Sequence, residues 1–279
     1  PFARVRPRDL VPVTPAIEEP TTGETMGEAA ERMAKENGIS REAQDAWAAR
    51  SHQRAAAARE DGRLGETIAP VYLPPGYDTV VTMDNGIRPD TSVERLATLR
   101  PVFDREHGSL TAGNSSPLTD GGSALVLVDG ERARSDGLEP LGWIRSWAWS
   151  AVDPAGQLLQ GPAYAVPVAL ERAGVSMSDI GLMEMHEAFA AQVLSNLQAL
   201  DSDSFAEEEL GRSAAVGHPD EDRINVTGGS LAVGHPFGAT GGRVTLTLLH
   251  EMRRLDVELG LVTVCAAGGM GFAMVLERR

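Results

Sequence analysis

Cysteine is nearly absent from this sequence of 279 residues, which contains a single one, Cys265. A disulfide needs two cysteines, so none can form within the chain. The sequence also lacks a signal peptide and any apolar run near the roughly 20 residues that span a bilayer. We therefore expect a reducing compartment, such as a bacterial cytoplasm, for the protein that carries this sequence.

Positive charge is scarce as well. Lysine and arginine number 25 against 40 aspartates and glutamates, which gives a formal net charge of −15. Such a surface repels a phosphate backbone, so nucleic acid is excluded as an expected partner. A small anionic ligand can still bind where a few arginines or helix N-termini make a local positive patch. Hydrophobic residues are abundant, at 42%, and can form the core of a globular protein.

The first 20 residues, beginning at Pro1, are rich in Pro, Arg and Val and follow no helical or strand periodicity. We interpret them as an extended connector and expect further polypeptide upstream. Helices are predicted over residues 26–37 and about 42–60, with Ser40 as the N-cap of the second, forming a packed helical hairpin. Residues 63–110 are rich in Pro, Gly and Asp, which indicates an irregular excursion. Residues 1–110 are therefore expected to form one accessory region.

The pattern changes after Gly113, where apolar runs begin to alternate with amphipathic segments, as is typical of an α/β domain. Strands are predicted at residues 123–128, 182–185 and 259–264, and the segment GFAMVLE is predicted to return beside the last of these as a hairpin. Helices are predicted over residues 161–174, 187–200 and about 239–254.

His235 lies in the segment NVTGGSLAVGHPFGATGGRV, whose six glycines let the backbone approach a ligand closely. A phosphate-binding loop is a poor alternative, because the pattern G-x-x-x-x-G-K-[ST] is absent. A histidine that merely fills a tight turn remains an alternative. The tripeptide Gly-His-Pro also occurs at residues 217–219, where acidic neighbours predict an exposed His218 without a role.

His186 and Cys265 each follow a predicted strand, the position at which open α/β sheets bind ligands. His186 could donate a hydrogen bond into a cleft at the carboxyl edge of the sheet. Cys265 precedes the turn AAGGMG, whose backbone amides could form an oxyanion hole beside a thiol. A satisfied structural histidine and an inert buried cysteine are the respective alternatives.

Several segments together resemble the thiolase family in their order and approximate spacing: TGETMGEAAERMA, ISREAQDAWAARSHQRA, TAGNSSPLTDGGSALVL, MHEAFAAQ, GGSLAVGHPFGATGGR and CAAGGMG. The sequence HEAFA in place of NEAFA, with DNGIRP and GPAYAVP, is most similar to the beta subunit of the fatty-acid oxidation trifunctional complex and its bacterial relatives. The resemblance implies a layered αβαβα fold of two similar halves. Residues 1–110 would be the remainder of a loop domain with connecting elements, and residues 111–279 the C-terminal domain.

The family resemblance also implies an activity, the thiolytic cleavage of 3-oxoacyl-CoA by CoA in fatty-acid β-oxidation. His235 would be the base that activates a nucleophilic cysteine, and Cys265 a second cysteine that moves a proton at the acetyl-CoA carbon. His186, at a position usually held by Asn, would help to form an oxyanion hole with His235. The backbone of Ala267 and Gly268 would serve a second oxyanion hole.

Contacts to CoA follow from the same resemblance. Ser116 and Arg88 match positions that touch the pantetheine and nucleotide parts of CoA, and Ala188 and Phe189 match a wall beside the pantetheine. CoA is a substrate here, and neither a metal nor a further cofactor is implied. A homodimer or higher oligomer, and a hydratase/dehydrogenase partner subunit, are expected by analogy.

One departure from the family pattern is decisive for the expected activity. Thiolases use two cysteines, and the nucleophile belongs to the half of the fold that would precede Pro1. Cys265 cannot act as nucleophile and proton carrier at once, so we predict that this chain alone is inactive. Two alternatives stay open: a thiolase-like module that binds CoA or acyl groups without turnover, and a biosynthetic thiolase that forms acetoacetyl-CoA.

Overall fold

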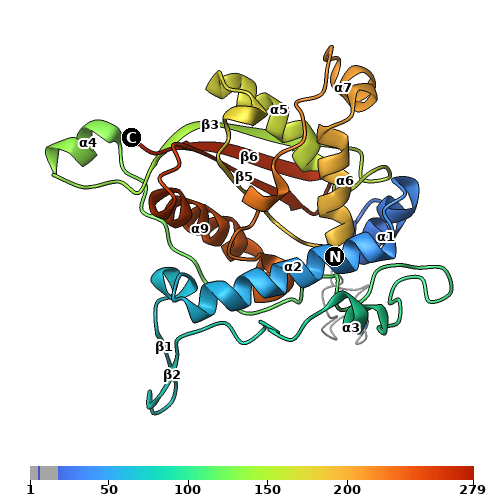
Figure 1. Cartoon of the computed structure of the whole chain (residues 1–279), viewed down its shortest axis with the longest axis horizontal. Coiled ribbons are helices and arrows are strands. Elements are labelled where there is room, and N and C mark those ends of the chain that lie inside the picture. The colour runs from blue at the N-terminus through green and yellow to red at the C-terminus, as the bar shows by residue number, and fades with distance from the viewer. Residues whose placement is uncertain (1–5, 7–17) are drawn as a thin grey trace.

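The computed structural model describes residue 6 and residues 18–279, so the predicted connector lies almost wholly outside the described residues. A four-stranded mixed sheet forms the centre, in the order β3-β6-β5-β4 (Figure 1). Its strands are β3 (Trp143–Ala151), β4 (Leu182–Met185), β5 (Leu259–Ala266) and β6 (Met270–Glu277). β4 and β5 are parallel, whereas β6 runs antiparallel to both β5 and β3.

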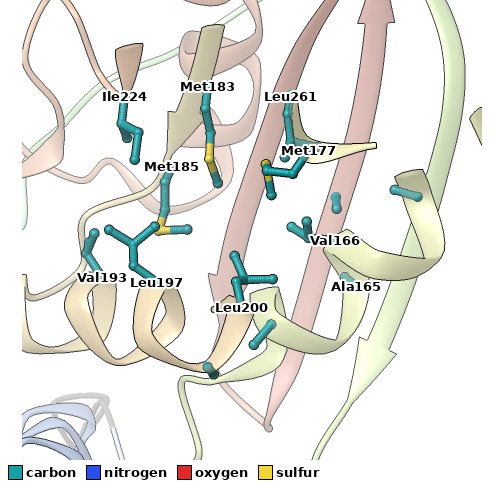
Figure 2. Close-up of a cluster of buried hydrophobic side chains, with 14 of the residues drawn as sticks. Ala165, Val166, Met177, Met183, Met185, Val193, Leu197, Leu200, Ile224 and Leu261 are labelled. Atoms are coloured by element: carbon teal, nitrogen blue, oxygen red, sulfur yellow. The ribbon is translucent and has the colours of Figure 1, made fainter. Parts of the chain in front are cut away.

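Helices cover both faces of this sheet. α5 (Gly161–Ala173) and α6 (Ala190–Leu200) pack on one face, where Leu261 of β5 belongs to the same cluster of buried side chains as Val166 and Leu197 (Figure 2). α9 (Thr240–Arg254) packs on the other face, where Val262 meets Leu248. Successive strand residues point to opposite faces, so a strand covered on both sides has to be apolar throughout. The predicted apolar strands at residues 182–185 and 259–264 are confirmed.

The two N-terminal helices pack directly on this α/β core. α1 (Met26–Glu36) begins with a capping box between Thr25 and Glu28, and α2 (Arg41–Glu60) has Ser40 as its N-cap, as predicted. Alanines of α1 pack against Ala191 of α6, and small side chains let the helices approach closely. Trp47 of α2 joins the main core cluster. The helical pair is therefore an integral layer of the core.

The remaining elements are short. They are η3 (Leu64–Thr67), β1 (Val71–Leu73), β2 (Thr79–Val81), α3 (Val93–Ala97), α4 (Gly130–Ser135), η4 (Met177–Asp179), α7 (Asp203–Leu210), η5 (Glu221–Arg223), α8 (Ser230–Val233) and η6 (Phe237–Ala239). β1 and β2 pair as an exposed hairpin within the predicted irregular excursion. Within the part of the chain that the structure describes, no helix is long and apolar enough to cross a membrane.

One predicted strand is wrong. Residues 123–128 form no strand, and their side chains are exposed, Val126 by 89% and Leu127 by 77%. A strand needs a neighbour for its backbone hydrogen bonds, and the four strands of the central sheet pair with one another and not with this segment. An apolar run by itself does not specify that neighbour.

The turn between β5 and β6 confirms the predicted hairpin. Ala266 pairs with Met270, and Gly268 and Gly269 in the turn have φ of +80° and +70°. A Cβ on Gly269 would lie 2.2 Å from the carbonyl oxygen of Val152, so both the conformation and the space there require glycine.

Candidate active site

A cavity of about 730 Å³ lies at the carboxyl ends of β4 and β5. Both halves of the sequence form its walls. The early part contributes Thr25, Met26, Gly27 and Phe103, and the later part contributes Ser115, Ser116, Leu118, Leu159, His186, Ala188, Phe189, His235, Phe237, Gly238, Val264, Cys265, Ala266 and Ala267. The lining is largely apolar, with two histidines and one cysteine as its titratable groups.

His186 lies directly after β4 and is 1% exposed. Its backbone N–H donates to the carbonyl of Thr263 on β5 over 2.9 Å, which extends the parallel pairing to the edge of the cavity. Its ring Nδ1 lies 2.8 Å from Oγ of Ser230. On the other side of β4, the side chain of Asn225 bonds both the N–H and the carbonyl of Met185, as a neighbouring strand would. The position of His186 is thus set on both sides.

His235 follows α8 and lies in a turn that depends on Gly234. Gly234 has φ of +93°, and a Cβ there would lie 2.4 Å from a side-chain atom of Thr119. The Nδ1 of His235 lies 2.7 Å from Oγ1 of Thr240, at the start of α9. The rings of His186 and His235 are 4.1 Å apart between centroids. Because each Nδ1 already has a hydroxyl partner, the Nε2 atoms remain for a ligand; neither has a hydrogen bond to any described residue.

A short extended segment, residues 114–118, joins the two histidine turns. The N–H of Ser116 donates to the carbonyl of Ala188 over 2.9 Å, and Ser115 forms a bridge with Phe189. Two residues later, the carbonyl of Pro117 accepts from the N–H of His235, also over 2.9 Å. These contacts hold residues 186–189 out of helix, so α6 begins at Ala190 and not at residue 187 as predicted.

The carboxylate of Glu187 anchors the first histidine turn to α2. Glu187 is 1% exposed and accepts from Trp47 Nε1 at 2.9 Å and Ser51 Oγ at 2.7 Å, both on α2. It also accepts from Asn225 Nδ2 at 2.8 Å and from the N–H of Leu231 at 3.2 Å. A buried carboxylate is stable when its lone pairs are filled in this way. The side chain next to His186 therefore fixes the turn and leaves the imidazole to face the cavity.

Cys265 lies near the end of β5, 5% exposed, and its side chain lines the same cavity as the two histidines. The following residues 267–269 form the turn to β6, and Ala267 has no positive φ, so alanine fits there without strain. Burial raises the pKa of the Cys265 thiol to about 12. The thiol is therefore protonated at neutral pH and is a weaker acid than a free thiol, so it can give its proton only to a strongly basic acceptor.

The two histidines are neutral at neutral pH. Burial, and next the positive charge of Arg243, lower the pKa of His235 to about 4. Burial is also the main cause that lowers the pKa of His186 well below its ordinary value, followed by the charges of His235 and Arg243. A neutral imidazole can accept a proton at one nitrogen and donate a hydrogen bond from the other. The cavity thus combines two neutral imidazoles with one protonated thiol.

This arrangement can stabilise a developing oxyanion and move protons beside it. Among residue 6 and residues 18–279, no group of three or more His, Cys, Asp or Glu could hold a metal ion.

Comparison with known proteins identifies the family. The thiolase C-terminal domain family matches residues 138–278, and the thiolase N-terminal domain family matches residues 7–131. The chain belongs to the thiolase family. The boundary near residue 110 stays a prediction.

Among the relatives of this thiolase-family chain are 3-ketoacyl-CoA thiolases of Serratia proteamaculans (strain 568), 53% identical, and Escherichia coli (strain K12 / MC4100 / BW2952), 55% identical. Each comparison covers 99% of this chain and 63% of the relative, so the chain spans less than two thirds of their length.

Solved thiolase structures share its fold. The acetyl-CoA acetyltransferase of Bacillus anthracis is 38% identical with a TM-score of 0.83, over 94% of this chain and 62% of that one. A human mitochondrial 3-ketoacyl-CoA thiolase in complex with CoA is 30% identical with a TM-score of 0.81, over 94% and 61%. The predicted thiolase-like α/β fold is confirmed.

Most of the predicted site residues of this thiolase-family chain meet at the cavity. Those that line it are His186, His235, Cys265, Ala267, Ser116, Ala188 and Phe189. Gly268 and Arg88 do not. Gly268 lies in the turn just beyond Ala267, and Arg88 lies on an exposed loop where its backbone N–H donates to His52 Nδ1 at 3.2 Å. The individual roles of these residues toward CoA stay predictions.

Sequence analysis missed the polar groups behind the histidines. Ser230 and Thr240 flank His235 in the glycine-rich segment, but Ser230 bonds the other histidine. Arg243, on α9, donates to Ser230. The sequence shows hydroxyl residues near His235, so they could have been predicted as its partners. Which hydroxyl contacts which histidine depends on how α8 and α9 pack against β4, and the sequence does not show that.

Proposed function

We propose that the protein containing this chain cleaves 3-oxoacyl-CoA with CoA, releasing acetyl-CoA and a shortened acyl-CoA. The observation that carries the proposal is the meeting of His186, His235 and Cys265 at one apolar cavity. The names of the relatives, 3-ketoacyl-CoA thiolases, support the same chemistry.

The reaction needs the groups that this cavity provides. Breaking the bond between C2 and C3 of a 3-oxoacyl thioester leaves an enolate of acetyl-CoA at C2. Donors aimed at the thioester oxygen stabilise that enolate, and an acid near C2 completes the product. We assign the donor role to the Nε2 atoms of His186 and His235 and the acid role to the protonated thiol of Cys265, with His235 also serving as the base for a nucleophilic thiol.

The acyl group at C3 has to pass to a second thiol. A buried cysteine that acts as the acid at C2 cannot also attack C3, because covalent catalysis needs a thiolate at the acyl carbon. Under this proposal, a nucleophilic cysteine comes from polypeptide outside these 279 residues, and the chain by itself is inactive. Such polypeptide is compatible with a chain that spans 63% of its relatives.

Several finer assignments belong to the same proposal. The reaction would serve fatty-acid β-oxidation, as in the trifunctional-type beta subunits that the sequence HEAFA resembles. Ser116, Ala188 and Phe189 would line the pantetheine side, with Arg88 toward the nucleotide. A homodimer or larger oligomer, a hydratase/dehydrogenase partner subunit and a reducing compartment complete the proposal.

The test is an assay of the full-length protein with CoA and 3-oxoacyl-CoA substrates of increasing chain length, combined with trapping of the acyl-enzyme by acid quench and mass spectrometry. We expect thiolysis, with long chains accepted, and an acyl group on a cysteine other than Cys265.

His235→Ala should lower kcat/KM by about 10²–10⁴-fold, the usual contribution of a positioned general base. His218→Gln, which alters the exposed Gly-His-Pro histidine, is the matched control and should retain full activity.

Two results would overturn the proposal. Binding of CoA without thiolysis and without an acyl-enzyme would instead favour the non-catalytic binding module. Acylation of Cys265 itself would contradict its assignment as the acid at C2. Efficient turnover of acetoacetyl-CoA with poor turnover of long chains would reject the β-oxidation subtype.

A further inference from the structure

A chain of three polar side chains runs from α9 to the cavity. Nη2 of Arg243 donates to Oγ of Ser230 over 2.7 Å, and Oγ of Ser230 lies 2.8 Å from Nδ1 of His186. Ser230 and His186 are 0% and 1% exposed, so water does not compete for these bonds. The chain ends at the imidazole whose other nitrogen, Nε2, has no partner among the described residues.

The direction of each hydrogen bond follows from the chemistry of the first member. A guanidinium carries donors and no acceptor, so Ser230 Oγ has to accept from Arg243. The hydroxyl proton of Ser230 then needs an acceptor, and His186 Nδ1 is the one within reach in the described part of the chain. If His186 carried its proton on Nδ1, that hydroxyl proton would be buried without a hydrogen-bond partner, which is unfavourable.

We propose that Arg243, acting through Ser230, holds His186 in the Nε2–H tautomer and so makes it a permanent hydrogen-bond donor toward the cavity. Arg243 and Ser230 are positioning residues in this scheme, since neither lines the cavity. The inference rests on the proposed function for its consequence, the stabilisation of a thioester oxygen. The NH₂ group of an amide side chain is always a hydrogen-bond donor. An imidazole donates from Nε2 only in the tautomer that carries its proton there, so that tautomer has to be stabilised.

The surroundings of Arg243 affect the charge of its guanidinium, which donates to Ser230. Burial lowers the pKa of Arg243, and the acidic side chains of Glu184, Glu187 and Asp84 act in the opposite sense and favour its cationic form. The same positive charge opposes protonation of His186, and it adds to the effect of burial in lowering the pKa of that imidazole. The hydrogen bonds select the tautomer, and the charge disfavours the doubly protonated ring.

His235 differs from His186 in the hydroxyl group that its Nδ1 contacts. Its Nδ1 partner, Thr240 Oγ1, receives no hydrogen bond from a cation in the described residues, so this hydroxyl can act as donor or acceptor. His235 can therefore change its protonation during a reaction, as a base must. The charge of Arg243 lowers the pKa of both imidazoles, so the two differ in their hydrogen bonds: the hydroxyl beside His186 is committed as a donor, and the hydroxyl beside His235 is not.

The experiment is ¹⁵N NMR of the full-length protein labelled at histidine, with long-range ¹⁵N–¹H correlations that distinguish protonated from unprotonated ring nitrogens. The His186 signals are assigned by their loss in His186→Asn. We expect His186 Nε2 protonated and Nδ1 unprotonated at pH 7. A protonated Nδ1 on His186 in the wild type would overturn the inference without any variant.

Ser230→Ala and Ser230→Thr give the second comparison. Ser230→Ala should lower the population of the Nε2–H tautomer and reduce kcat by about 10–100-fold with little change in KM, because a transition-state contact is lost. Ser230→Thr, which retains the hydroxyl, should restore both readouts. A Ser230→Ala protein with an unchanged His186 spectrum would contradict the proposal. The spectrum reports the tautomer whether or not the protein is a thiolase, so failure of the inference and failure of the proposed function can be told apart.

Discussion

Burial governs the chemistry of the individual titratable residues at this cavity. Burial is the first cause that lowers the pKa of both His186 and His235. Burial also raises the pKa of Cys265. All three groups are therefore held in their uncharged forms at neutral pH. An uncharged site is suited to a thioester, whose charge appears during the reaction and not before it.

The lowered pKa of His235 predicts how stability depends on pH. The unfolded chain takes up a proton at this histidine near pH 6.5, whereas the folded protein does so near pH 4. Between these values the unfolded state binds more protons, so the contribution to stability is complete above pH 6.5 and is lost as the pH falls toward 4. Urea unfolding at pH 7 and pH 5 should therefore show a smaller loss of stability in His235→Gln than in the wild type.

His218→Gln is the control for that measurement, because His218 is exposed in a second Gly-His-Pro tripeptide. Its pH dependence should follow the wild type. Equal losses of stability in His235→Gln and wild type between pH 7 and pH 5 would show that His235 is not buried as described.

A site residue could be predicted from the sequence when its surroundings come from neighbouring residues in the chain, and not when they come from residues far away in the sequence. His186, His235 and Cys265 were predictable because each adjoins a strand end or a glycine-rich turn, a local feature. The bond from Ser230 to His186 was not, because it joins residues 44 positions apart across the packing of α8 on β4. Periodicity carries no information about such a pairing.

Close backbone approach decides the packing at the level of elements. The first residue of α5, Gly161, lies against Gly271 of β6, and a Cβ on Gly161 would come within 2.5 Å of the Gly271 nitrogen. The contact is with backbone, which cannot rotate away. Two glycines at one crossing therefore allow the helix to lie directly on the sheet.

We predict that Gly161→Ala destabilises the protein by about 2 kcal/mol, within the usual range for overpacking a filled core. Gly65→Ala is the matched control, because a Cβ at Gly65 meets nothing within 4 Å and its φ is not positive. That variant should stay within about 0.5 kcal/mol of the wild type. Thermal and urea unfolding measure both, and equal stability of the two variants would mean that α5 and β6 do not approach this closely.

Elements with strong local signals agreed with prediction, whereas the apolar run at residues 123–128 did not. The capped helices α1 and α2 and the strands β4 and β5 were predictable from caps and apolar runs. The run at residues 123–128 has the same composition as a buried strand yet lies exposed, because no strand of the described sheet is available beside it.

For the whole molecule, the cavity shows that the described residues before position 110 take part in the site. Met26 and Phe103 line it, and Trp47 and Ser51 hold Glu187 beside His186. The two helices were predicted correctly, but both pack on α6 and not on each other as a hairpin. Their spacing alone said nothing about their contacts with the site. The thiolase fold could be predicted because several different family motifs stand in the family's order along the chain. Agreement of several motifs identifies a family better than any one of them.

We propose that this chain provides the proton-handling side of a thiolase active site, with Cys265 as the group that moves the proton at C2 of acetyl-CoA. The most direct measurement is hydrogen–deuterium exchange at C2 of acetyl-CoA by the full-length protein in D₂O. Wild type and His218→Gln should exchange at the same rate, whereas Cys265→Ala should exchange about 10²-fold or more slowly while still forming an acyl-enzyme. Exchange by Cys265→Ala at the wild-type rate would contradict the account.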